Sequence, residues 1–352
     1  MKEMTSLERF LTACEGGIPD RVPFWIMRQV GRYDPDFENM VKKYGFNEVC
    51  KDAKKAAQLS LMPIKKLGFD AIIVLSDILF PAEAMGLKLE WRGAGPLFRN
   101  PIKGIDDVEK LKQVVVETDL PYTPKTVKIL YEKVGATTPI IGFCGGPFTI
   151  ATYMTMESTF PGVHNIRRML YASPKTVHML FQKITDILLE LIKAQIDAGA
   201  HAGMVFDSLA GHLTPSLYEE FVSPYQKRIL EEVKKYSVPA ILYLTGCCGI
   251  LNSMIRTGAD VIGIDSRIDI AEAKKRVGKA AALQGNLDPY TLFGSKKSIE
   301  VAVRDCLRKA APNGGYIFNT GEGLIEGLTF ESVAETVAAV KKYGKYPIKL
   351  TS

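Results

Sequence analysis

Eight short apolar runs recur along the 352-residue chain, and each run ends in polar residues or glycine. The stretches between the runs have helical character, and in residues 173–198 apolar side chains recur with a period close to 3.6. Strands that alternate with helices predict parallel strands joined by crossover helices. The predicted strands are residues 21–27, 71–75, 138–143, 202–206, 238–244, 260–264, 280–283 and 316–318.

Eight such strands predict an α/β fold, a single (β/α)8 TIM barrel with a short N-terminal extension, formed by one domain over residues 1–352. In a barrel of this kind the polar ends of all strands meet on one face, where barrel enzymes build their active sites. A doubly wound open sheet is the rival architecture. It predicts a glycine fingerprint after the first strand, whereas an arginine-rich segment follows the first run here.

Composition limits the classes of function. A net charge of +6 and 47% apolar residues are typical of a globular protein with a large core. The six cysteines show no Cys-x-x-Cys spacing, which favours reduced thiols over a disulfide framework. Neither a signal peptide nor an apolar run of about 18 residues, as a membrane span needs, is recognisable. The sequence therefore predicts a cytoplasmic protein with no membrane or nucleic-acid partner.

The segment after the first predicted strand is the richest in functional groups. Arg28 and Arg32 flank Gly31 there. Guanidinium groups are permanently charged forks that suit carboxylates or phosphates, and glycine lets the backbone approach a ligand. The alternative is a surface loop with two solvated arginines.

Two acids follow buried runs in the same way. Asp77 comes after residues 71–75 and precedes an apolar stretch, where a carboxylate is costly unless a cation or several donors meet it. Asp207 and Ser208 follow residues 202–206. For Asp77 and for Asp207, a capping role is the alternative to a functional one. Tyr153 lies just beyond a glycine turn, and its hydroxyl either reaches the barrel mouth or is buried.

A metal site is not predicted. The four histidines show no ligand spacing, and the adjacent pair Cys247 and Cys248 is awkward for one ion. A phosphate-binding loop and a Gly-x-Ser-x-Gly elbow are also missing from the sequence.

Together these segments resemble the uroporphyrinogen decarboxylase family over about residues 7–342. The combination of Met-Arg-Gln-x-Gly-Arg-Tyr with Ser-Asp-Ile-Leu is highly specific. The motifs that carry the resemblance are residues 23–33, 75–79, 146–154, 206–213, 258–265 and 283–289. The resemblance implies a barrel, a homodimer, no cofactor or metal, and removal of CO₂ from the four acetate side chains of the tetrapyrrole uroporphyrinogen III, which gives coproporphyrinogen III.

The resemblance also implies roles for individual residues. Asp77 is the central carboxylate, which accepts hydrogen bonds from pyrrole N–H groups and stabilises the cation that forms when a ring carbon is protonated. Arg28 and Arg32 hold substrate carboxylates, and these two arginines complete the catalytic set. Further substrate contacts are assigned to Gln29, Val30, Gly31, Tyr153, Ser208 and Glu322.

Three departures from the family pattern accompany the match. Glu322 stands where the family has histidine, so it should repel a polyanionic substrate unless it is protonated or turned away. Ser266 replaces a tryptophan after Asp265, and residues 156–160 replace a glycine- and serine-rich stretch.

Two other functions remain open. One is a corrinoid-dependent methyltransferase of the same superfamily, in which zinc is bound by a His-x-Cys motif. The corresponding residues 243–246 read Tyr-Leu-Thr-Gly, and the retained residues 27–33 and 76–79 favour the decarboxylase. The other is a paralogue or carrier that binds a different tetrapyrrole.

Overall fold

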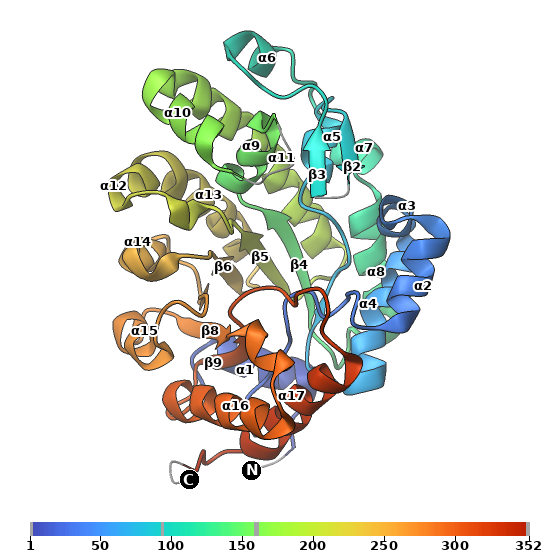
Figure 1. Cartoon of the computed structure of the whole chain (residues 1–352), viewed down its shortest axis with the longest axis vertical. Helices are drawn as coiled ribbons and strands as arrows, with labels where there is room; N and C mark the ends of the chain where they lie inside the picture. Colours follow the sequence, from blue (N-terminus) through green and yellow to red (C-terminus); the bar gives the residue numbers. More distant parts are fainter. Residues whose placement is uncertain (1–2, 93–94, 158–161, 350–352) are drawn as a thin grey trace.

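A curled parallel sheet forms the centre of the molecule, and helices cover its outer side (Figure 1). The computed structural model describes residues 3–92, 95–157 and 162–349. Seven strands pair in the order β1-β4-β5-β6-β7-β8-β9, and a separate hairpin pairs β2 with β3. The strands are β1 (Ile72–Ile73), β2 (Leu89–Arg92), β3 (Gly95–Phe98), β4 (Ile140–Gly145), β5 (Ala202–Phe206), β6 (Ala240–Tyr243), β7 (Val261–Gly263), β8 (Ala282–Leu287) and β9 (Tyr316–Thr320).

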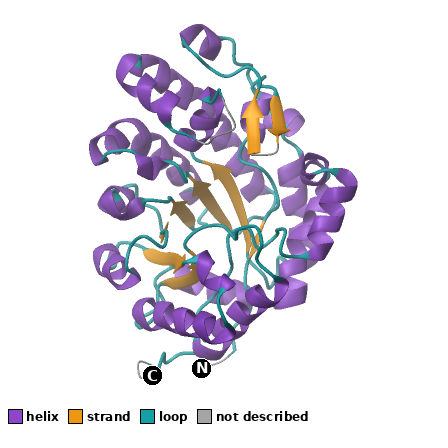
Figure 2. Ribbon diagram, in the orientation of Figure 1, coloured by secondary structure: helices purple, strands orange, loops and turns teal. Residues whose placement is uncertain are grey.

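Helices connect the strands and form the outer layer that Figure 2 shows in purple. The α-helices are α1 (Ser6–Cys14), α2 (Pro35–Tyr44), α3 (Phe46–Lys51), α4 (Ala53–Leu67), α5 (Phe80–Ala84), α6 (Ile105–Glu109), α7 (Val116–Asp119), α8 (Tyr122–Val134), α9 (Pro147–Thr155), α10 (His164–Ala172), α11 (Pro174–Asp197), α12 (Pro215–Leu217), α13 (Ser223–Lys234), α14 (Leu251–Arg256), α15 (Ile270–Val277), α16 (Lys296–Ala310) and α17 (Phe330–Tyr343). Short 3₁₀ or π turns are η1 (Ala210–His212), η2 (Tyr218–Val222), η3 (Cys247–Gly249) and η4 (Pro289–Phe293).

Local sequence explains where several helices begin and end. Helix α1 starts at a capping box, in which Thr5 accepts from the Glu8 N–H and Glu8 accepts from the Thr5 N–H. Helices α3 and α4 are separate, because Asp52 between them adopts an extended conformation and caps α4 with its side chain. None of the helices in the described ranges is both long and apolar enough to cross a membrane.

The first predicted strand, residues 21–27, is not a regular strand. Phe24 forms one isolated parallel bridge with Phe318 of β9, because Pro23 has no N–H with which to extend the ladder. The Phe318 N–H donates to the Pro23 carbonyl (2.9 Å), and the Asp70 N–H donates to the Phe24 carbonyl (2.9 Å). The segment thus lies between β9 and the start of β1, and the sheet has seven regular strands where the sequence predicted eight.

The seventh predicted run, residues 280–283, ends too early. Strand β8 continues to Leu287, and Gln284 and Asn286 pair within it instead of forming a loop. The burial of both faces explains the error, since residues 282–287 are all buried although two of them are polar.

Two apolar layers hold the sheet. Side chains inside the curve pack in one cluster that includes Trp25 and Met27 from the first segment. Alternate residues of each strand face this inner layer, and the others face the helices. The inner cluster also contains Ala71, Ile73, Ile141, Ala202, Met204, Ile241, Tyr243, Val261, Ala282 and Ile317.

A buried ion-pair network closes the amino-terminal side of the sheet. Asp70, which is 1% exposed, accepts hydrogen bonds from Arg9 (2.8 Å), from both Nη atoms of Arg21 (2.5 and 2.6 Å) and from Ser6 (3.1 Å). Arg9 also bonds Asp20. The network ties α1 to the start of β1, and both chain termini lie at this end (Figure 1).

Candidate active site

Asp77 follows the carboxyl end of β1 and is partly buried. Its Oδ1 accepts a hydrogen bond from the Leu79 N–H (2.8 Å). Burial raises the pKa of Asp77 to about 6, and Glu83 acts in the same direction, whereas the Leu79 N–H and the charge of Arg28 lower it. The site therefore contains a carboxylate that few protein groups neutralise.

Arg28 is exposed and lies in a strained turn with φ of +62°. Gln29 fixes that turn: its buried side chain donates to the Ala71 carbonyl (2.9 Å) and accepts from the Ile26 N–H (3.2 Å). The backbone carbonyl of Gln29 accepts from the Tyr33 hydroxyl (2.7 Å). The polar groups of Gln29 are thus used within the protein, where they hold Arg28 in place.

Gly31 and Gly323 allow close packing around Arg28. A Cβ atom at Gly31 would lie 2.7 Å from the Arg28 carbonyl oxygen, and one at Gly323 would lie 2.6 Å from the Arg28 Cδ. The loop after β9 is further held by the Leu324 N–H, which donates to the Met27 carbonyl (2.9 Å). Two segments almost 300 residues apart in sequence therefore meet at Arg28.

Arg32 is held only by an exposed ion pair among the described contacts. Its Nη1 lies 2.9 Å from Oε2 of Glu326, and the two side chains are 65% and 77% exposed. Val30 and Gly31, between the two arginines, are half-buried. The guanidinium of Arg32 is consequently accessible to a ligand.

Tyr153 lies on α9 and is half-buried. Burial raises the pKa of its hydroxyl, the charge of Asp77 raises it further, and the charge of Arg28 opposes both. Tyr153, Asp77 and Arg28 are therefore close enough to interact electrostatically. The structure brings these three predicted site residues together.

Asp207 is a helix cap, which is the alternative that the sequence left open. It is fully buried and accepts from the Thr149 N–H at the start of α9 (2.7 Å) and from Gln226 (2.8 Å). Gln226 in turn accepts from the Tyr218 hydroxyl (2.6 Å). Burial raises the pKa of Asp207, while these donors lower it. Sequence patterns did not identify Gln226 or Tyr218, because their spacing gives no sign of a shared partner.

Ser208, next to this cap, is half-buried, and its carbonyl accepts from the Thr245 N–H (3.3 Å). His212 on η1 is exposed. The structure thus places Ser208 at the end of β5, with its hydroxyl outside the capping network.

Glu322 pairs with Arg267, a cation that no sequence motif identified. Its Oε1 accepts from Nη2 of Arg267 (2.7 Å), and the Nε of Arg267 lies 3.6 Å from Oδ2 of the buried Asp265. A carboxylate at position 322 is expected to have a positive neighbour. That expectation was the only feature of the sequence that could have pointed to Arg267. In the third departure, Glu157 pairs with Lys103 (3.1 Å), and residues 158–160 lie outside the described residues.

A metal site requires several ligand side chains held close together. Within the described ranges there is no group of three or more His, Cys, Asp or Glu side chains that could hold one. Cys247 is buried and its thiol donates to Asp265 (3.1 Å), whereas Cys248 is exposed.

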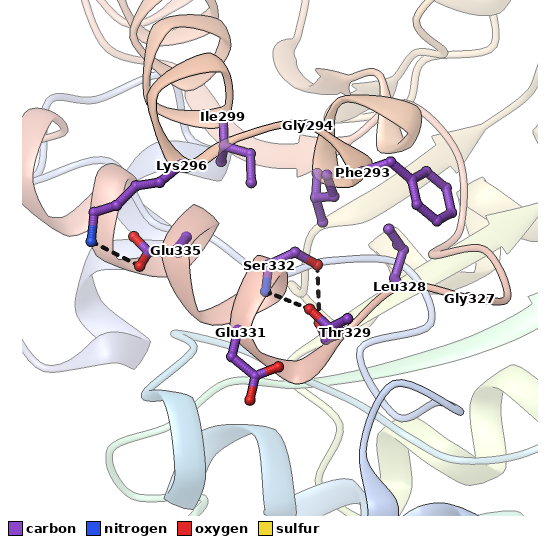
Figure 3. A pocket seen from close by; sticks show the side chains of 11 residues that line it. Phe293, Gly294, Lys296, Ile299, Gly327, Leu328, Thr329, Glu331, Ser332 and Glu335 are labelled. Atoms are coloured by element: carbon purple, nitrogen blue, oxygen red, sulfur yellow. Dashed lines mark hydrogen bonds and ion pairs between the residues drawn. The ribbon is translucent and has the colours of Figure 1, made fainter.

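A pocket of about 290 Å³ lies beside this face, between η4 and the first turns of α16 and α17 (Figure 3). Phe293 and Leu328 line one side, and the ion pair of Lys296 with Glu335 lies at the other. The predicted site residues do not line it.

A parallel strand–helix fold with a half-buried acid and accessible guanidinium groups beyond its strand ends defines a class, that of α/β enzymes acting on anionic small molecules. A sequence model of the uroporphyrinogen decarboxylase (URO-D) family matches residues 5–343. The chain belongs to the uroporphyrinogen decarboxylase family, as its motifs predicted.

Bacterial relatives cover nearly the whole chain. The uroporphyrinogen decarboxylase of Geotalea uraniireducens (strain Rf4) is 41% identical over 334 residues, which are 95% of this chain and 98% of that protein. The uroporphyrinogen decarboxylase of Anaeromyxobacter dehalogenans (strain 2CP-C) is 40% identical over 343 residues, covering 96% and 99%.

Solved structures agree in fold at lower identity. A methyltransferase from Methanosarcina mazei superposes with a TM-score of 0.80 at 23% identity, covering 97% of this chain and 99% of that one. A B12-independent methionine synthase from Shewanella sp. W3-18-1 superposes with a TM-score of 0.56 at 12% identity, covering 92% and 94%. These two likenesses concern the fold alone.

Proposed function

We propose that the chain is a carboxy-lyase that converts uroporphyrinogen III to coproporphyrinogen III in haem biosynthesis. The setting of Asp77 carries the proposal, because its carboxylate follows the end of β1, is poorly neutralised and interacts electrostatically with Arg28. Membership of the family supports this activity. The methyltransferase alternative is not favoured, since its support is a likeness in fold and residues 243–246 lack the zinc motif.

In the proposed mechanism the substrate lies over Asp77, which accepts hydrogen bonds from pyrrole N–H groups. A proton adds to a pyrrole ring carbon and leaves a cationic ring. The bond between the acetate CH₂ and its carboxylate then breaks, CO₂ leaves, and the bonding electrons neutralise the ring. A fixed negative charge away from water stabilises the cation as it develops. A second proton then adds to the resulting exocyclic CH₂ and gives the methyl group, and the first proton leaves the ring carbon, which restores the neutral pyrrole.

The other site residues bind the substrate in this proposal. Arg28 and Arg32 hold carboxylates, and Arg28 also acts as proton donor or as electrostatic partner. Tyr153 and Ser208 contact the macrocycle, with Val30 and Gly31 at the edge of the site. Gln29 acts through Arg28, since its side chain fixes the turn that presents the guanidinium.

We also infer that residues 21–27 close the sheet into an eight-membered barrel within one domain spanning residues 1–352. Hydrogen bonds join this segment to β9 on one side and to the start of β1 on the other. Trp25 and Met27 pack in the inner cluster with side chains from the strands. One outer apolar cluster extends from Val22 to Val340, which supports a single domain.

The homodimer and the cytoplasmic location belong to the same proposal. Tyr290 and Phe293 are 64% and 54% exposed with ring centroids 6.2 Å apart, an apolar pair that a second copy would cover. The six cysteines are unpaired, which fits a reducing compartment. Sedimentation equilibrium on the wild type and on Phe293→Ser tests the dimer, and a monomeric wild type would contradict it.

The decisive test is an anaerobic incubation of the pure protein with uroporphyrinogen III. After oxidation, chromatography separates porphyrins that carry eight, seven, six, five or four carboxyl groups. We expect stepwise loss down to the four-carboxyl product. Persistence of the eight-carboxyl compound, with the macrocycle bound, would replace the proposal by a carrier or a paralogue with another substrate.

A further inference from the structure

The loop after β9 contacts three arginines in succession. Glu322 pairs with Arg267, Gly323 packs against Arg28, and Glu326 pairs with Arg32. Arg28 and Arg32 are already placed in the proposed substrate site. Arg267 approaches the same loop from the end of β7, one residue away from the Arg28 contact.

Arg267 is presented by a rigid loop. Asn286 of β8 is buried, and its Nδ2 donates to the carbonyls of both Asp265 and Ile268 (2.8 Å each), on either side of Arg267. The adjacent chain is packed as tightly, since a Cβ atom at Gly321 would lie 2.4 Å from the Ser266 nitrogen. A cation held in this way binds a ligand with little loss of backbone freedom.

The guanidinium itself is far from saturated. It is 59% exposed and, among the described contacts, donates one hydrogen bond, to Glu322. The Nε of Arg267 lies 3.6 Å from Oδ2 of Asp265, and this oxygen has no hydrogen-bond partner among the described residues although Asp265 is fully buried. Attraction to this oxygen holds the Nε side of the guanidinium inward, and the outer edge of the guanidinium stays open.

We propose that Arg267 is a third carboxylate-binding residue of the substrate site and that Glu322 is its resident counter-ion, which a substrate carboxylate displaces. This inference rests on the proposed function. A partly exposed ion pair contributes at most about 1 kcal/mol, whereas a carboxylate bound under the macrocycle is shielded from water and engages the planar fork at two points. Exchange of Glu322 for substrate is therefore favourable.

The pairing also makes binding depend on the number of substrate carboxylates. Glu322 competes with every incoming anion, so the substrate with eight carboxylates displaces it more readily than the product with four. Arg267 and Glu322 together are expected to favour substrate entry and product release.

The test compares Arg267→Gln, Glu322→Gln and the double variant, each assayed for KM and kcat with uroporphyrinogen III. We expect Arg267→Gln to raise KM roughly three- to tenfold with kcat within about twofold. Glu322→Gln should lower KM and slow release of coproporphyrinogen III. In the Arg267→Gln background, Glu322→Gln should have no such effect, because the two residues act as a pair.

Arg308→Gln is the matched control, since Arg308 pairs with Asp305 on α16 at similar exposure and outside the site. Uroporphyrin III, the oxidised octacarboxylate, serves as the binding probe in all variants at low and high salt. Unchanged KM and unchanged probe affinity in Arg267→Gln would overturn the inference. A wild type that binds the probe but releases no CO₂ would instead overturn the proposed function, and the binding arm would still decide the role of Arg267.

Discussion

Asp70 and Asp77 lie at opposite ends of the same short strand, β1, and their surroundings differ completely. Asp70, at the amino end, is buried among Arg9, Arg21, Ser6 and the Phe24 N–H, all of which donate to it. Asp77, at the carboxyl end, has one backbone donor and a pKa raised to about 6. The protein neutralises Asp70 with several donors, whereas it gives Asp77 one hydrogen bond.

The same contrast extends to whole faces of the sheet. On the amino-terminal side Arg9 is buried and Arg21 half-buried, and both are bonded to acids inside the protein. On the opposite side, Arg32 after residues 21–27 and Arg267 after β7 are more than half exposed. Oδ2 of the buried Asp265 has no hydrogen bond among the described residues. Satisfied charges stabilise the fold, and unsatisfied ones remain available for chemistry.

Among the variants considered, Asp77→Asn should reduce activity the most. A small reduction would contradict the contrast between Asp77 and Asp70. We expect decarboxylation to fall about a thousandfold, since the charge that stabilises the cationic ring is lost. The folded state should become more stable by about 2 kcal/mol near pH 7.5, because a partly buried charge has been removed while the Leu79 N–H keeps an acceptor. Anaerobic turnover and urea unfolding measure the two effects.

Asn is the suitable replacement, because it conserves shape and changes only the charge. Turnover near that of the wild type would exclude Asp77 as the central carboxylate. A large loss of stability would show that Asp77 is structural, like Asp70.

Asp70→Asn should show the opposite signature. Removing this charge leaves Arg9 and Arg21 partly buried without their shared partner, so we expect a loss of about 3 kcal/mol in the free energy of unfolding. The kcat of the protein that remains folded should stay within about twofold of the wild-type value, since the network lies at the opposite end of β1 from Asp77. Urea unfolding and assays below the transition test both statements, and unchanged stability would contradict them.

Sequence patterns predicted the strand–helix alternation well, because each element carries its own period and its own caps. Helix α1 begins at the Thr5 capping box, and α15 begins after the Asp269 cap. The first strand could not be predicted correctly, since its apolar residues are buried as in a strand while Pro23 prevents a regular ladder. The end of β8 was missed because buried Gln284 and Asn286 resemble loop residues when only polarity is considered.

Sequence motifs predicted members of the candidate site, but they could not predict which side chains pair in three dimensions. Asp77, Arg28 and Tyr153 lie in motifs, and the structure brings them together. Gln29 and Asp207 also lie in motifs, yet their side chains hold the protein together. Arg267 shows the limit, since only a three-dimensional contact links it to Glu322, 55 residues further along the chain.

The pH dependence of activity and stability should show a smaller effect of Asp77. The pKa of Asp77 is about 6 in the folded protein and near 4 in the unfolded chain. Activity that needs the carboxylate should therefore fall as the pH drops through about 6. Between about pH 4 and 6 the folded state binds more protons at this group, so its contribution to stability decreases as pH rises. The contributions of this group to the pH dependence of activity and of stability should vanish in Asp77→Asn. A wild-type profile of kcat/KM that is flat down to pH 5 would contradict the role of the Asp77 carboxylate.

Arg32→Gln should have the smallest effect on the fold and still a measurable one on binding. The Arg32–Glu326 pair is more than half exposed on both sides, so its loss should change the free energy of unfolding by less than about 0.5 kcal/mol. We expect KM for uroporphyrinogen III to rise roughly threefold or more, because a guanidinium that holds a substrate carboxylate is lost. Glu326→Gln is the control, as it removes the same ion pair but leaves the cation. If both variants raised KM equally, the ion pair itself would matter; if neither did, Arg32 would be an ordinary solvated arginine, and the accessible charges of the site would reduce to Arg28 and Arg267.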